Sequence, residues 1–223
     1  MSDNEGAFFY VSETPHAEHV DREGDRLAMW LFLFTEILLF GALFLAYSVY
    51  RTQYIDDFEE AASHLNTTVG TVNTLILLLS SLTVVVSIVA IRKGNKMLAV
   101  AMMFITIVCG AAFLIIKSFE WKEKFAHGIQ LSLKTTVDAG GASEILGNLP
   151  HGQQVFYGLY FVMTGLHALH VIVGMIIFAI VTVLIFKDVI NKKDVVILEN
   201  TGLYWHIVDL IWIFLFPLYY LIG

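Results

Sequence analysis

The feature that most constrains this chain is a long apolar run at positions 27–50, LAMWLFLFTEILLFGALFLAYSVY. A helix needs about 20 mostly apolar residues to cross the hydrocarbon core of a bilayer, so this run predicts a transmembrane helix. It carries one ionisable side chain, Glu36, near its middle. An acid at that depth costs roughly 3 kcal/mol or more unless it is neutral, paired or hydrated. We therefore expect Glu36 to face protein, a cavity or a bound polar group.

Composition agrees with a membrane protein. The 223 residues are 57% hydrophobic and only 15% charged, whereas a soluble domain has about 25% charged residues. The formal net charge of -7 arises largely in an acidic tail at residues 1–26. The tail has no apolar core before a cleavage site, so it is not a signal peptide. No basic patch indicates a nucleic-acid partner.

Five apolar spans are expected, at about 27–50, 69–91, 97–119, 153–186 and 202–222. They predict one all-α, polytopic membrane domain at residues 27–223, a bundle of five transmembrane helices. In lipid only helices and closed barrels satisfy every backbone group, and these runs are too long and too apolar for barrel strands. Lysine and arginine are more frequent in the loops on the side of the N-terminus. This bias predicts a cytoplasmic N-terminus and tail, and a C-terminus on the outer side.

Several polar and small residues recur within the spans. Asn73, Ser80 and Ser87 stand seven residues apart and line one stripe, and Gly165 and Gly174 allow close approach in the fourth span. Small and hydrogen-bonding side chains of this kind are typical of helix–helix contacts in membranes. We expect all five to act in helix packing.

The fourth span contains GLHALHVIVG, in which His167 and His170 stand at i and i+3. Two histidines on one face could bind a metal, especially beside a carboxylate. A di-iron bundle requires a repeated Glu-x-x-His pattern, and no Glu precedes either histidine by three residues. The favoured interpretation is that both are neutral, hydrogen-bonded side chains that act in packing or in contact with lipid, with no bound metal. The spacing alone leaves a metal or haem site open.

Two further pairs stand three residues apart. In YWHIVDLIWIFLFPLYY, at 204–220, His206 and Asp209 stand at i and i+3, so they could hydrogen-bond each other near the inner surface. Lys117 and Glu120, followed by Lys124, predict an ion pair near the outer surface. No serine or cysteine stands in a nucleophile setting, so we expect no catalytic residue.

Five segments together resemble subunit III of the haem-copper oxidases, the cytochrome c and quinol oxidase subunit 3 family. They occur in the family's order and cover nearly every span: MWLFLFTEILLFGALFLAY at 29–47, NTLILLLSSLTVV at 73–85, FLIIKSFEW at 113–121, GLYFVMTGLHALHVIVG at 158–174 and YWHIVDLIWIFLFPLYY at 204–220. The short leading tail is similar to the five-helix bacterial form, which lacks the two leading helices of the mitochondrial form.

The resemblance implies an accessory, non-catalytic subunit with no redox centre of its own, with haem and copper in partner subunits. Such a subunit packs on subunit I of an oxygen-reducing, proton-pumping oxidase of aerobic respiration, binds structural phospholipid, and supports proton uptake and the stability of the complex. Its implied location is the bacterial inner membrane, as a multi-pass protein, with other oxidase subunits and a larger respiratory supercomplex as further partners.

Residue by residue, Glu36 matches the family's membrane-embedded glutamate and His170 the second histidine of its GxHxxH segment. His206 and Asp209 match its WHxxD segment. The resulting hypothesis is that Glu36 and His170 face a groove between helices and help to seat a phospholipid. His167, His206 and Asp209 are candidates for the same role or for buried polar contacts.

Two alternatives remain open. One is the accessory subunit of a nitric oxide reductase. The other is a freestanding transporter or intramembrane metalloenzyme that uses Glu36, His167 and His170. For an oxidase, the electron donor could be cytochrome c or quinol.

Overall fold

The structure, a computed structural model, describes residues 22–126, 149–190 and 195–222. Every regular element in these ranges is a helix: α1 (Arg22–Gln53), α2 (Ile55–Ser63), α3 (Thr67–Lys93), α4 (Lys96–Ala126), α6 (His151–Phe186) and α7 (Val196–Tyr220). All except α2 are long and apolar enough to cross a membrane. The predicted all-α fold with five spans is confirmed. The orientation of the termini stays a prediction.

The helices extend beyond most of the predicted spans. Helix α7 begins at Val196, before the predicted start at residue 202, and α4 continues to Ala126, past residue 119. Helix α1 begins at Arg22, inside the predicted acidic tail. The rest of that tail and residues 127–148, between the third and fourth spans, lie outside the described residues. Polar residues can continue a helix beyond the hydrocarbon, so an apolar run marks the span rather than the whole helix.

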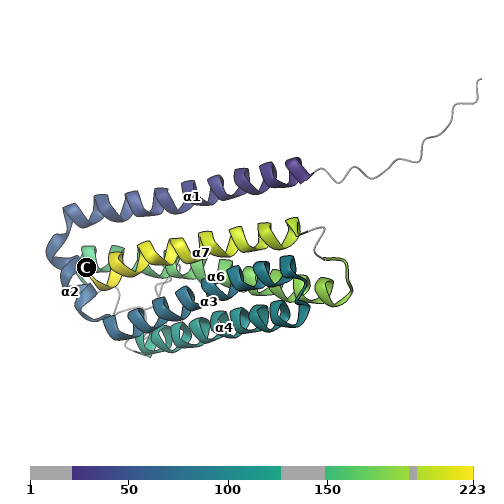
Figure 1. The fold of residues 1–223 in the computed structure, drawn as a ribbon. Helices are drawn as coiled ribbons and strands as arrows, with labels where there is room; N and C mark the ends of the chain where they lie inside the picture. Colours follow the sequence, from purple (N-terminus) through teal and green to yellow (C-terminus); the bar gives the residue numbers. More distant parts are fainter. Residues whose placement is uncertain (1–21, 127–148, 191–194, 223) are drawn as a thin grey trace, which may run out of the picture.

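Helices α3, α4, α6 and α7 form a bundle, and α1 lies along its side (Figure 1). Helices α3, α4, α6 and α7 each pack on two neighbours of the set, and α1 packs on α6 and α7. The short α2 lies at the end of the bundle where α1 and α7 finish, which is called the α2 end below. The arrangement leaves one long side of α1 without protein contact, and the structure exposes many of its apolar side chains.

The turn between α3 and α4 sets these two helices antiparallel. Gly94 ends α3 with a φ of 78°, a left-handed conformation that glycine adopts without strain. The side chain of Asn95 then accepts a hydrogen bond of 3.1 Å from the Leu98 N–H in the first turn of α4. Midway along the pair, the hydroxyls of Thr83 and Thr106 lie 2.7 Å apart.

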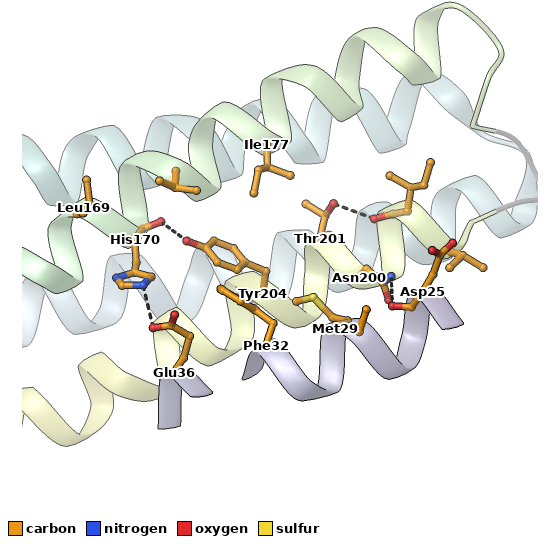
Figure 2. Close-up of a pocket in the computed structure, with 14 residues that line it drawn as sticks. Asp25, Met29, Phe32, Glu36, Leu169, His170, Ile177, Asn200, Thr201 and Tyr204 are labelled. Atoms are coloured by element: carbon orange, nitrogen blue, oxygen red, sulfur yellow. Dashed lines mark hydrogen bonds and ion pairs between the residues drawn. The ribbon is translucent and has the colours of Figure 1, made fainter. Parts of the chain in front are cut away.

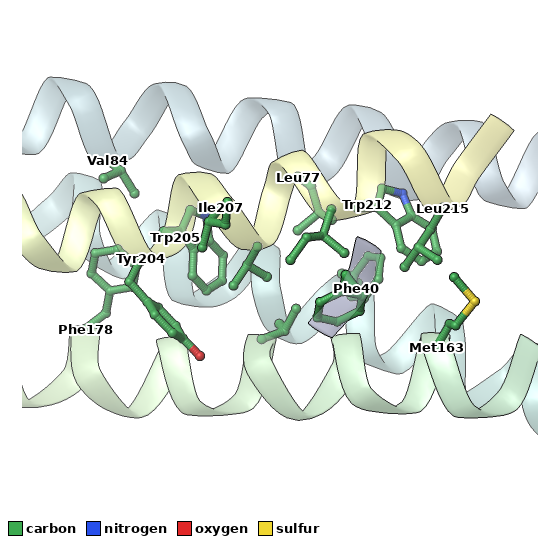
Figure 3. Close-up of a cluster of buried hydrophobic side chains, with 14 of the residues drawn as sticks. Phe40, Leu77, Val84, Met163, Phe178, Tyr204, Trp205, Ile207, Trp212 and Leu215 are labelled. Atoms are coloured by element: carbon green, nitrogen blue, oxygen red, sulfur yellow. The ribbon is translucent and has the colours of Figure 1, made fainter. Parts of the chain in front are cut away.

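Large aromatic side chains of α7 fill the bundle interior (Figure 3). Trp205 and Trp212 are 0% and 1% exposed. Their indole N–H groups donate to hydroxyls of α3, Trp205 to Ser80 at 2.9 Å and Trp212 to Thr74 at 3.0 Å. A buried indole needs such a partner, so the two bonds fix how α7 is rotated against α3.

Glycines make room for these rings. A Cβ at Gly174 would come within 2.7 Å of the Trp205 ring, and one at Gly110 within 3.1 Å. Gly165 lies against Trp121, with 3.3 Å between a built Cβ and the ring. The glycines of α4 and α6 therefore let helix backbones approach the tryptophans closely.

The polar stripe of α3 lies inside the bundle. Asn73, Ser80 and Ser87 are each 0% exposed. The two serines donate to carbonyls three residues earlier in α3, at 2.6 and 2.7 Å. The Asn73 amide has no hydrogen-bond partner among the described residues.

Candidate functional site

Glu36 lies near the middle of α1 and points toward α6 (Figure 2). Its Oε2 lies 3.0 Å from Nε2 of His170, and the two side chains are 14% and 15% exposed. The geometry of this contact is not that of a hydrogen bond, and Oε2 has no hydrogen-bond partner among the described residues. The carboxyl group therefore retains capacity to bond a polar group that approaches from outside the chain.

A second contact of the His170 ring shows which of its nitrogens carries a hydrogen. Nδ1 lies 2.7 Å from the carbonyl oxygen of Leu166. A carbonyl only accepts, so Nδ1 carries a hydrogen. In the neutral ring Nε2 is then the acceptor, and it lies 3.0 Å from the Glu36 carboxyl oxygen.

Aromatic side chains from two helices hold His170 in place. The Tyr204 hydroxyl of α7 donates to the His170 backbone oxygen at 3.1 Å. The Phe40 ring of α1 meets the imidazole edge-on, with centroids 5.7 Å apart. Phe32, one turn before Glu36, stacks on Tyr204 at 5.9 Å. The pair therefore sits on three packed helices, a more rigid support than a loop.

A groove of about 690 Å³ between α1, α6 and α7 begins at this pair. This volume lies in the range of about 300–1,000 Å³ that small-molecule sites occupy. The groove is lined mainly by apolar side chains, among them Met29, Phe32, Leu169, Val173 and Ile177. In Figure 2 it extends from Glu36 and His170 toward Asp25 and Asn200, where α1 and α7 begin. An apolar groove with one polar pair at mid-membrane depth suits the chain of an amphiphile.

Charged groups lie beside the far end of the groove. The Glu199 carboxylate of α7 contacts Arg26 of α1 at 3.5 Å and Arg92 of α3 at 2.5 Å. Both arginine side chains are more than half exposed. Such surface pairs add about 0–1 kcal/mol of stability each. With Asp25 in the lining, the end of the groove where α1 and α7 begin therefore carries charges of both signs.

The two histidines of α6 face different surroundings. His167 is 0% exposed and lies inside the four-helix bundle, with ring centroids 5.4 Å from Phe113 and 5.2 Å from Trp212. Neither of its nitrogens has a hydrogen-bond partner among the described residues. In the described part of the chain no group of three or more His, Cys, Asp or Glu side chains is placed to hold a metal ion. His167 does not line the groove.

The hydrogen bond that the spacing allows between His206 and Asp209 is not formed, and His206 lies well inside α7 rather than at its start. Because α7 begins at Val196, His206 lies about 15 Å along the helix, near its midpoint. Its Nδ1 lies 2.7 Å from the Ser81 hydroxyl of α3. Asp209 is 4% exposed, and neither carboxyl oxygen has a hydrogen-bond partner among the described residues. The His206 ring therefore contacts α3 and not Asp209, which lies one turn further along α7.

Sequence reasoning missed the burial of a polar network near the α2 end. Lys117 and Glu120 form the expected ion pair, at 3.2 Å, but they are 2% and 7% exposed. Two tyrosine hydroxyls complete the network: each accepts from the Lys117 ammonium, at 2.9 Å for Tyr160 and 2.7 Å for Tyr220. Each then donates to Glu120 Oε1, at 2.7 and 2.5 Å. The tyrosines come from α6 and α7, and nothing in their local sequence marks them as partners of Lys117.

Comparison with known proteins assigns the chain to a family. The family model described as cytochrome c oxidase subunit III matches residues 8–132 and 148–223, which include every described helix. The chain belongs to the cytochrome c oxidase subunit III family. The resemblance inferred from the sequence is confirmed.

Individual relatives of this subunit III carry related names. A protein of Aeropyrum pernix named heme-copper oxidase subunit I+III is 29% identical over 222 residues, which is 96% of this chain but only 25% of that protein. Cytochrome c oxidase subunit 3 of Corynebacterium diphtheriae is 28% identical over 86% of this chain and 85% of its own length. Cytochrome bo(3) ubiquinol oxidase subunit 3 of Pseudomonas putida is 28% identical over 88% and 85%. The chain thus spans about a quarter of the fused relative and most of the two separate subunits.

Proposed function

We propose that this chain is an accessory subunit of a proton-pumping haem-copper terminal oxidase in a bacterial inner membrane. In this proposal it packs on subunit I and holds structural phospholipid in the groove beside Glu36 and His170. Family membership supports the first part. The relative whose name joins subunits I and III supports contact with subunit I. Relatives are named for both cytochrome c and ubiquinol, so both donors stay candidates.

The observation that carries the lipid proposal is the position of the Glu36–His170 pair at the end of an apolar groove. An acyl chain along Val173 and Ile177 would cover apolar lining. It would also keep bulk water from a pair that is already largely buried. The exposed Arg26 and Arg92 at the other end offer positive charge to a lipid phosphate. The groove therefore fits the chain of a phospholipid whose headgroup lies at the end where α1 and α7 begin.

We infer that the Glu36–His170 pair supports proton uptake by sharing a single proton. A carboxyl–imidazole pair that is neutral as a whole can release and regain a proton without a change in backbone structure. The groove leads from the pair to the end of the bundle that is predicted to be cytoplasmic. We propose that the pair exchanges protons near the uptake side of the oxidase.

Filling the groove tests lipid binding. Val173 lines the groove and is 39% exposed. In the purified complex, Val173→Trp is expected to lose one bound phospholipid per chain, counted by mass spectrometry of extracted lipids. The matched control is Val108→Trp, at a position 49% exposed on α4, which does not contact α1. An unchanged lipid count in Val173→Trp would contradict the lipid proposal.

Glu36→Gln separates lipid binding from proton exchange. Glutamine keeps the shape and hydrogen-bonding capacity of a protonated glutamate but cannot share a proton with His170. We expect this variant to keep its lipid while the number of turnovers before inactivation falls several-fold, measured as oxygen consumption over time. A turnover lifetime equal to that of the wild type would contradict the proposal that the pair exchanges protons.

A further inference from the structure

The groove explains Glu36 and His170 but not the polar group at the middle of α7. His206 and Ser81 are half-buried near the midpoints of α7 and α3, on the outer surface between these helices. Their contact occupies Nδ1 of the imidazole. The other ring nitrogen, Nε2, has no hydrogen-bond partner among the described residues.

Three exposed hydroxyls on α1 and α4 are satisfied within their own helix. Thr35, Ser48 and Ser118 each donate to a carbonyl three or four residues earlier, at 2.7, 3.0 and 2.7 Å. Such side chains can face hydrocarbon at little cost because no donor is left free. The Nε2 of His206 has no such partner among the described residues, so lipid is a poor environment for this side chain.

A buried acid lies directly behind this surface. Asp209, one turn further along α7, is 4% exposed and without a hydrogen bond in the described structure, and Ser81 lies near it. The acid, the hydroxyl and the imidazole thus form a polar line from the bundle interior to its outer face. Exposed apolar side chains lie within one or two helical turns of Ser81 and His206 on the same helices: Leu78, Leu82 and Val85 of α3, and Leu210 and Ile213 of α7.

We propose that this surface, the α3/α7 face, is where a transmembrane helix of subunit I docks, with a polar side chain of that helix hydrogen-bonded to His206 Nε2. The proposal rests on the proposed function for the identity of the partner. Acyl chains carry no hydrogen-bonding group at mid-membrane depth, whereas a helix can place one there. The apolar side chains around His206 supply the packing surface that such a helix needs.

The fused relative agrees with a direct contact between the two subunits, because one chain there carries both names. The opposite side of the bundle, formed by α4, offers a natural comparison. Its exposed side chains near mid-depth, Phe104 and Val108, are apolar. The polar group at mid-depth therefore distinguishes the α3/α7 face from the α4 face.

Photo-crosslinking in the full complex, in its native membrane, tests the proposal. Benzoylphenylalanine is placed at Leu82 on the α3/α7 face or at Val108 on α4, positions that are 60% and 49% exposed. After irradiation, adducts are identified by mass spectrometry. Leu82 is expected to cross-link to the haem-bearing subunit and Val108 is not. Cross-linking of Leu82 to lipid alone, or of Val108 in its place, would overturn the proposal.

The role of His206 has its own readout. His206→Leu is expected to lower, several-fold, the amount of haem-bearing subunit that co-purifies with the chain, and His206→Gln is expected to restore part of it. Ser118→Leu on α4 is the control and should retain the partner. If the wild-type chain binds no haem-bearing subunit, the proposed function itself is wrong. If the wild type binds it and His206→Leu binds equally, only the docking role of His206 is wrong.

Discussion

Lys117→Met is expected to lower the free energy of unfolding by about 3–5 kcal/mol, the cost of leaving one member of a buried ion pair without its partner. The ammonium of Lys117 contacts Glu120 and the hydroxyls of Tyr160 and Tyr220. Without it the Glu120 carboxylate stays buried with two hydroxyl donors and no cation. The network joins α4, α6 and α7, so its loss loosens three helices together.

Unfolding in mixed micelles, followed by tryptophan fluorescence as denaturing detergent is added, measures this effect. The control is Lys122→Met on the same helix, where the side chain is exposed and a change within about 0.5 kcal/mol is expected. The double variant Lys117→Met/Glu120→Gln removes both charges and should regain part of the lost stability. Equal unfolding midpoints for Lys117→Met and Lys122→Met would show that the network adds nothing.

Trp205→Ala is also expected to lower the free energy of unfolding by about 3–5 kcal/mol, because it leaves a cavity at the centre of the bundle. The ring is 0% exposed, packs on Phe178 at 5.3 Å, and fills the space left by Gly110 and Gly174. In a membrane, helices are held together mainly by packing and hydrogen bonds, and this substitution removes both. The Ser80 hydroxyl also loses its indole donor.

The same unfolding assay, read by circular dichroism because a tryptophan is lost, tests the effect. Trp30→Ala serves as the control, since that ring is 61% exposed on α1. Trp205→Phe should fall between the two because it retains most of the ring volume. If Trp205→Ala were as stable as Trp30→Ala, the packing described for α7 would be wrong.

The spans could be predicted from the sequence because crossing a bilayer is a local property of length and apolarity. The need of Glu36 for a polar neighbour was equally local, and in the structure the carboxyl group faces His170 and the groove. The family could be recognised because its segments recur in order across the whole chain. None of these inferences required knowledge of which helices touch.

The parts that sequence reasoning missed depend on how each helix is rotated and where it begins. His167 and His170 lie about 60° apart around α6. His170 faces the groove because α1 packs on that side of α6, whereas His167 faces Phe113 and Trp212 inside the bundle. His206 was expected near the inner membrane surface because the fifth span was predicted to begin at residue 202, whereas α7 begins at Val196. The burial of Lys117 depends on tyrosines from two distant segments, which no spacing rule connects to it.

Affinity purification of the chain from its native membranes in a mild detergent tests the central claim most directly. The account predicts that a larger haem-bearing subunit co-purifies in equal amount, that the preparation consumes oxygen, and that the separated chain is colourless. A chain that purifies without any haem-bearing partner, or that alone transports a solute or binds a stoichiometric metal ion, would contradict it.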